Sequence, residues 1–189
     1  MTRKLEKFGS TLVAVGLAVL GTGVFALSQD PPVNSHDKHF VSDAAEAGLA
    51  EVELGQMAQS KASNDKVKDF AQKMVDDHNK VNQELKEDAQ KLGISIPDHM
   101  SVAEKAEKTK LDMYSGGHFD RAYIEGAVKD HRDDIAAFER EIKEGQNPDL
   151  KAFAEKNLPT LKEHLRLAEK TQRQITGESR NSSPTGTSQ

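Results

Sequence analysis

Apolar residues recur at alternating intervals of three and four positions along four segments of the chain. This spacing aligns them on one face of an α-helix, as in the seam of a helical bundle. Ser42 is a plausible N-cap for the first helix, and Pro159 is expected to kink the last. The sequence therefore predicts an all-α fold, a four-helix bundle over residues 40–176. The predicted helices span residues 41–62, 63–93, 119–143 and 148–175.

The connections between these segments predict how the helices are joined. Two are tight, whereas the connection between the second and third helices holds about 25 residues. Within it, Ser101 and Glu104 form a capping box at the start of a short helix that ends before Gly116. Two helical hairpins joined by one long crossover is the arrangement of ferritin-like bundles.

The second and fourth helices begin with similar sequences. The eleven residues from Asn64 read NDKVKDFAQKM and those from Asn147 read NPDLKAFAEKN, with five identities at an offset of 83 positions. This similarity predicts that the two hairpins are related by an internal duplication.

The N-terminal segment has the pattern of a secretory signal. Three basic residues precede an uncharged run over residues 11–26, in which Val24 and Ala26 satisfy the small-residue rule before a cut. We expect residues 1–26 to be removed and the mature chain to start near Leu27. The alternative is an uncleaved membrane anchor. However, sixteen residues with three glycines are fewer than the roughly 20 that a spanning helix needs.

The two ends of the mature chain are expected to lie outside the bundle. Residues 27–39 carry Pro31 and Pro32 and have the composition of a tether. Residues 177–189 contain no large apolar side chain, so this tail is expected to be disordered.

Composition excludes several classes of partner. The chain has no cysteine, which excludes disulfides, thiolate metal sites and a lipid-modified cysteine. The first 26 residues contribute +2 to a net charge of −5, which leaves about −7 on the mature chain. Phosphate binding requires clustered Lys and Arg, so nucleic acid is excluded as a partner. We expect a periplasmic protein with no membrane span in its mature part, whose partners are further copies of the chain or envelope proteins.

Four polar residues interrupt the apolar seams, one on each helix. They are Glu51, His78, His131 and His164. A rise of about 1.5 Å per residue places all four roughly 18 to 27 Å from the hairpin ends, near the middle of the bundle. Imidazole and carboxylate groups are ligands for a zinc, iron, copper or manganese ion. The sequence thus suggests one metal ion, with the set Glu53, Asp77, Tyr123 and Asp134 close enough to orient or replace ligands.

The same residues have a structural interpretation. Buried histidines can hydrogen-bond neighbouring carboxylates and form a satisfied network without a metal. Gly48 and Gly55 lie on the seam with Glu51, and close packing of two helices is by itself enough to explain both glycines.

Enzyme motifs are missing from the seam. Di-iron bundles need Glu-x-x-His on two helices, but Val75, Val128 and Leu161 stand three residues before the histidines. Met74 lies one turn before His78, as a haem ligand would, although Met at this spacing more often belongs to a core. No nucleophile elbow or phosphate loop is found, and we assign no catalytic residue.

Three stretches carry a family resemblance. They are AEVELGQMAQSKASNDKVKDFAQKMVDDHNKVNQEL from Ala50, FDRAYIEGAVKDH from Phe119 and LKAFAEKNLPTLKEHL from Leu150. With them the chain resembles domain-of-unknown-function family 4142, over nearly all of residues 40–168. The resemblance implies export, an outer-membrane association and a ferritin-like fold, but no established activity. It also implies that Glu51, Asp77, His78, Tyr123, His131 and His164 fall on family motif positions.

Two hypotheses follow. In the first, the exported bundle holds one metal ion through its polar layer, in storage, sensing or redox chemistry. In the second, it is a non-enzymatic structural or partner-binding protein of the cell envelope or of the stress response. The histidines then form a buried hydrogen-bond network.

Overall fold

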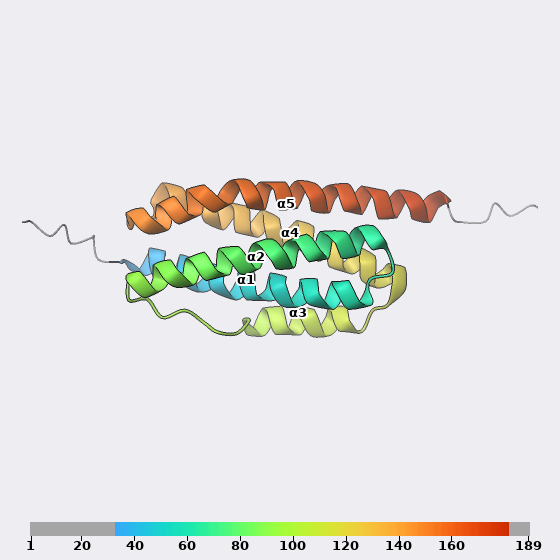
Figure 1. Ribbon diagram of the computed structural model, residues 1–189, viewed down its shortest axis with the longest axis horizontal. Helices are drawn as coiled ribbons and strands as arrows, with labels where there is room; N and C mark the ends of the chain where they lie inside the picture. The colour runs from blue at the N-terminus through green and yellow to red at the C-terminus, as the bar shows by residue number, and fades with distance from the viewer. Residues whose placement is uncertain (1–32, 182–189) are drawn as a thin grey trace, which may run out of the picture.

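The computed structural model describes residues 33–181, which form five α-helices and no strand (Figure 1). The predicted all-α class is confirmed. The predicted signal, residues 27–32 of the predicted tether and residues 182–189 lie outside the described residues. Within the described part, no helix has the length and hydropathy to span a membrane. The helices are α1 (Ser35–Lys61), α2 (Asp65–Lys91), α3 (Val102–Asp112), α4 (Gly116–Glu144) and α5 (Pro148–Asn181).

The four long helices form two antiparallel hairpins, α1 with α2 and α4 with α5. The hairpins pack through α1 against α4 and through α2 against α5. The connection between them holds α3, which lies along the outer side of α1 and also contacts α4 (Figure 1). The predicted capping box of α3 is confirmed, because the Ser101 hydroxyl accepts from the Glu104 N–H and the Glu104 carboxylate accepts from the Ser101 N–H.

Two glycines set the distance between α1 and α2. A Cβ on Gly55 would lie 2.8 Å from Cγ2 of Val75 and 3.2 Å from the backbone oxygen of Ala71. A Cβ on Gly48 would overlap the Asn82 side chain. Both positions therefore let the helices approach, as the sequence suggested.

The start of α1 differs from the prediction. Asn34 caps this helix by accepting from the backbone N–H of Asp37 at 2.9 Å, so the predicted cap at Ser42 was wrong. Residues 35–39, predicted as part of a tether, are helical. Packing explains the extra turns, because Asp37 is fully buried and the Phe40 ring lies 5.1 Å from that of Phe138.

The last helix is also longer than predicted. It continues through Pro159 and past Gly177, and ends at Asn181. Pro159 removes a hydrogen bond to the backbone oxygen of Glu155. Both residues are exposed, so this carbonyl is on the face of α5 where water can replace the missing donor.

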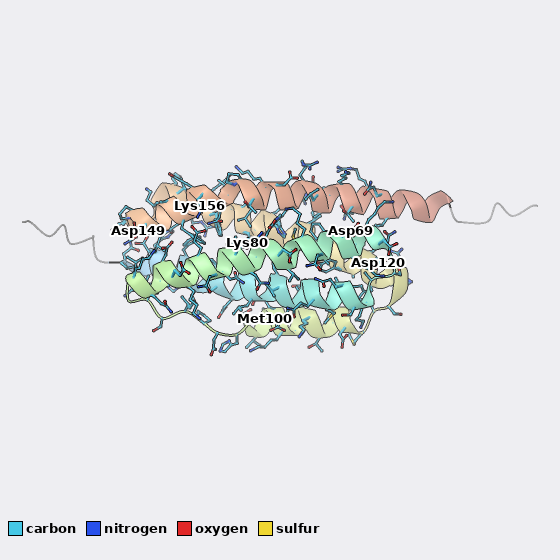
Figure 2. All side chains as sticks on the ribbon, viewed as in Figure 1. Asp69, Lys80, Met100, Asp120, Asp149 and Lys156 are labelled. Carbon is cyan, nitrogen blue, oxygen red and sulfur yellow. The ribbon has the colours of Figure 1, made fainter. Side chains whose placement is uncertain are left out.

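Reciprocal caps relate the two hairpins. Asp37 of α1 accepts from the backbone N–H groups of Gln146 and Asn147, at 2.9 and 3.1 Å, just before α5. Asp120 of α4 accepts from the corresponding pair before α2, at 2.9 and 3.0 Å. Figure 2 labels Asp120 near the start of α4. The aspartates and their partners are each 83 positions apart, the same offset as in the sequence repeat. These caps support the predicted duplication.

Apolar side chains form two core clusters, one toward each end of the bundle. One contains Phe70, Met74 and Phe119, and the other contains Leu85 and Phe153. Met74 is thus an ordinary core residue. On α2, α4 and α5 a histidine stands between the residues of the first cluster and those of the second.

Candidate metal centre

Three histidines from three helices meet between the apolar clusters. His78 of α2, His131 of α4 and His164 of α5 each bring one ring nitrogen within 4.8 Å of the others. Their ring centroids lie 5.3 to 5.5 Å apart, and their exposed fractions are 3%, 0% and 1%. The helix rise predicted a common depth for these residues, and the structure brings all three together.

A backbone carbonyl orients the ring of His131. Nδ1 of His131 lies 2.9 Å from the carbonyl oxygen of Ala127, one turn earlier in α4. Because a carbonyl only accepts, Nδ1 carries the proton and Nε2 carries the lone pair. Nε2 faces Nε2 of His78 at 3.4 Å, so both rings direct ligand nitrogens toward the same point.

Asp77 orients the ring of His164. Although partial burial acts to raise the pKa of Asp77, hydrogen bonds from Lys73, His164 and Lys80 hold it well below its usual range. The ionised carboxylate accepts from Nε2 of His164 at 3.1 Å. The lone pair of His164 is then on Nδ1, which is buried and has no hydrogen-bond partner. Metal-binding histidines typically have such a carboxylate or carbonyl partner on the second nitrogen.

The three imidazoles are neutral at pH 7. Burial lowers the pKa of His78 well below its usual value, and repulsion from His131 and His164 adds to this. Burial also lowers the pKa of His131, and lowers that of His164 to about 4. Neutral rings keep their lone pairs, which is the form that a metal ion requires.

Glu51 lies beside this cluster rather than within it. Its Oε1 is 3.4 Å from Nδ1 of His131, on the ring edge away from the nitrogen that faces His78. The Nδ1 proton already points to Ala127, so Oε1 has no hydrogen-bond donor. Burial, followed by the charges of Asp130 and two glutamates, raises the pKa of Glu51 to about 8. The predicted fourth ligand is therefore displaced to the outer side of His131.

Asp134 is the next carboxylate along this layer. Burial, and then the charge of Glu51, raises the pKa of Asp134 to about 7. Together with His78, Asp134 lines a small cavity of about 20 Å³. About 10–15 Å³ is enough to hold one water, so one water has room beside His78.

Two other predicted residues do not contact the histidines. Glu53 pairs with Lys108 of α3 at 2.7 Å. It stands two positions after Glu51, which turns its side chain to another side of α1. Tyr123 is buried against Phe70 and Phe119. Burial and then Glu51 raise its pKa well above the usual value, and its hydroxyl has no hydrogen-bond partner.

Several buried polar groups escaped the sequence reasoning. The Ala127 carbonyl, which orients His131, belongs to the backbone, so no side chain in the sequence could indicate its role. Asp37 and Asp120 had a signal, because both lie at the repeat offset of 83. Glu141 of α4 is fully buried, and burial followed by the charge of Asp37 raises its pKa to about 7. It contacts His36 at 3.1 Å, far along α4 from His131.

The arrangement has a clear chemical capacity. Three neutral imidazoles, two of them held from behind by a carboxylate and a carbonyl, form a nitrogen donor set of the kind that holds a transition-metal ion.

Solved structures of three bacterial proteins share this fold. A DUF305 fragment from Deinococcus radiodurans has a TM-score of 0.68 at 13% identity, over 76% of this chain and 99% of that chain. A candidate secreted DUF305 protein from Streptomyces coelicolor has a TM-score of 0.64 at 13% identity, and the match covers 75% of this chain and 92% of that chain. A conserved hypothetical protein from Mycobacterium tuberculosis has a TM-score of 0.57 at 15% identity, and the match covers 82% of this chain and 97% of that chain. At these identities the similarity shows the all-helical fold alone.

Sequence comparison gives the family. No curated protein matches the chain. The family model described as Domain of unknown function (DUF4142) matches residues 23–171, which is most of the sequence. The helical fold, its polar layer and this match agree with the resemblance found in the sequence: the chain belongs to the DUF4142 family.

Proposed function

We propose that this protein binds one transition-metal ion through His78, His131 and His164. One observation carries the proposal: three buried, neutral imidazoles each bring a ring nitrogen within 4.8 Å of the others, and Nδ1 of His164 has no hydrogen-bond partner. A metal ion would accept all three lone pairs at once.

The competing interpretation is a buried hydrogen-bond network, and the geometry disfavours it. His164 does have a carboxylate partner in Asp77, but a fully satisfied network also needs a proton donor for every lone pair that the rings leave facing the cluster. The protons of His131 and His164 instead point outward, to Ala127 and Asp77. A buried acceptor left without a donor costs about 1–3 kcal/mol. His78 can supply one proton at most, so the cluster without a metal leaves at least one acceptor unsatisfied.

The donor set favours zinc or copper. Neutral imidazole nitrogen suits both ions, whereas manganese prefers carboxylate and water oxygens. Iron in ferritin-like bundles is held by paired carboxylates, and Glu51 lies behind His131 rather than facing the cluster. The ligand nitrogens are almost fully buried, which suits holding an ion more than presenting it to a substrate. We therefore propose metal sequestration, in a ferritin-like bundle, rather than catalysis.

We place this function outside the cytoplasm. The basic start and apolar run of residues 1–26 support export, as does the Streptomyces protein of similar fold that is described as a candidate secreted protein. N-terminal sequencing of the periplasmic fraction tests this proposal. A start near Leu27 is expected, and a membrane-bound chain that retains Met1 would contradict it.

Metal analysis of the untagged mature protein tests the function. The duplication suggests the test variant, because Leu161 and Val81 occupy the positions equivalent to His78 and His164. The triple variant H78L/H131A/H164V therefore keeps an apolar layer. A matched control replaces three exposed histidines with alanine, namely His39, His99 and His118.

After reconstitution with zinc or copper and desalting, the wild type and the control are expected to retain one ion per chain. The triple variant is expected to retain none while its circular dichroism stays helical. A wild type that takes up no zinc, copper, iron or manganese would refute the proposal. Equal metal content in the triple variant would also refute it.

A further inference from the structure

Two adjoining cavities lie between α1, α3 and α4, on the side of His131 away from the other histidines. Their volumes are about 210 and 400 Å³, and both are lined by Glu51, Leu54, Glu107 and Asp130. We call them together the α3 groove, because α3 forms one wall.

The α3 groove is strongly acidic. Nine carboxylate side chains line the two cavities, against only two lysines, Lys110 and Lys129. Lys129 is engaged by Asp130 at 3.2 Å and by Asp133 at 3.0 Å. A cleft lined by one sign of charge concentrates counter-ions, so cations accumulate here.

Two of the carboxylates converge at the mouth of the groove. Oε1 of Glu107 and Oδ2 of Asp130 lie 3.6 and 4.0 Å from the same point, where a side chain on Gly126 would begin. The missing side chain leaves the space between them open. Burial and then the charge of Asp130 raise the pKa of Glu107, as expected for like charges that no cation separates.

The inner wall of the groove carries buried polar atoms without partners. The Tyr123 hydroxyl and Oε1 of Glu51 have no hydrogen-bond partner, and these residues are only 3% and 4% exposed. An ordinary acidic surface has no such atoms, because its carboxylates are solvated. Buried oxygens that line a cavity need a ligand or water to satisfy them.

We propose that the α3 groove is an outer site for a hydrated divalent metal ion, held by Glu107 and Asp130 at its mouth and by Glu51 and Tyr123 behind. One water needs about 10–15 Å³ of such cavity volume, so the smaller cavity has room for an ion with a shell of six waters. Glu51 belongs to the groove and also lies 3.4 Å from His131. Glu51 thus lies between the groove and the histidine cluster. We infer that the ion reaches the three histidines from the groove, and this second step rests on the proposed function.

Binding of Mn²⁺ tests the outer site by itself. Mn²⁺ prefers carboxylate and water oxygens, and the free ion is counted by its electron paramagnetic resonance signal. The titration uses H78L/H131A/H164V, in which the inner site is removed. Adding E107Q/D130N is expected to weaken Mn²⁺ binding at least tenfold. A matched control, D69N/E155Q, removes two exposed charges from α2 and α5 and is expected to bind as before.

Two results would overturn the outer site. One is equal Mn²⁺ affinity with and without E107Q/D130N. The other is no Mn²⁺ binding to H78L/H131A/H164V, including a result in which only an organic cation such as spermidine binds.

The rate of zinc uptake tests the passage to the histidines. In stopped-flow exchange from a coloured zinc chelator, E107Q/D130N is expected to load at least threefold more slowly than the wild type, with the same final stoichiometry. An unchanged rate would overturn the passage. If the wild type takes up no zinc but Mn²⁺ still occupies the groove, the proposed histidine site fails and the outer site stands.

Discussion

His164 offers a direct test of the buried, neutral imidazole cluster. In the metal-free protein, burial lowers the pKa of His164 from 6.5 to about 4. The unfolded chain therefore takes up a proton as the pH falls through 6.5, while the folded chain does not until the pH nears 4. This difference stabilises the unfolded state at low pH. Between pH 7.5 and pH 5, it removes about 2 kcal/mol of folding stability.

Replacement of His164 by valine removes the titrating group, and Val81 shows that the repeat accommodates valine at this position. We expect the free energy of unfolding of the wild type, relative to His164→Val, to fall by about 2 kcal/mol between pH 7.5 and pH 5. Urea denaturation in the presence of a chelator measures both proteins at several pH values. The Leu161→Val variant, in the same helix one turn earlier, controls for altered packing because it carries no titrating group.

A constant difference between wild type and His164→Val across this pH range would refute the reasoning. A difference that favours the wild type at low pH would also refute it, since it would show that His164 is protonated beside Asp77 in the folded state.

Three further predictions use other parts of the structure. Asp77→Asn is expected to weaken zinc or copper affinity about 10–100-fold with unchanged stoichiometry, measured by competition with a chelator, because the partner that orients His164 is weakened; unchanged affinity would contradict this role. Gly55→Ala is expected to cost about 1–3 kcal/mol in urea unfolding, because its Cβ meets Val75 and a backbone oxygen. Val75→Ala should recover part of that loss, and no recovery would count against the contact. Asp37→Ala and Asp120→Ala are each expected to cost about 1–2 kcal/mol, and to add in the double variant because they cap opposite ends of the bundle; a strongly non-additive pair would show that the caps are not independent.

Apolar periodicity predicted the helices and their two hairpins well. The four long segments, the tight turns and the capping box at Ser101 all depend on residues close together in the sequence, so sequence patterns are enough to predict them. The first turn of α1 does not follow from them. Pro31 and Pro32 suggested a tether, but Asn34 supplies a cap and the buried Phe40 holds the turn through contacts with α4 and α5. Such contacts come from residues far away in the sequence.

In the candidate site, too, local sequence patterns predicted some features, whereas others depend on contacts between distant residues. Helix rise placed His78, His131 and His164 at one depth, because each distance is counted within a single hairpin. Periodicity gives the face of a helix but not the direction of a ring edge. The Ala127 carbonyl turns His131 so that Glu51 meets its outer nitrogen. Asp77 is next to His78 in the sequence but accepts a hydrogen bond from His164 on another helix.

The α3 groove could not be predicted from periodicity. It depends on where the crossover lies over α1 and α4, and Glu107 and Asp130 are separated in the sequence by the turn into α4. The missing side chain at Gly126 gave no signal either, since a glycine inside a helix has several explanations.

X-ray absorption at the zinc edge of the mature, zinc-loaded protein tests the central claim most directly. The account predicts three imidazole nitrogens at about 2.0–2.1 Å, with the scattering of outer ring atoms that marks histidine, and the loss of this signature in H78L/H131A/H164V. A shell of oxygens without imidazole scattering, or an imidazole signature that survives in the triple variant, would contradict a metal site at the histidine layer.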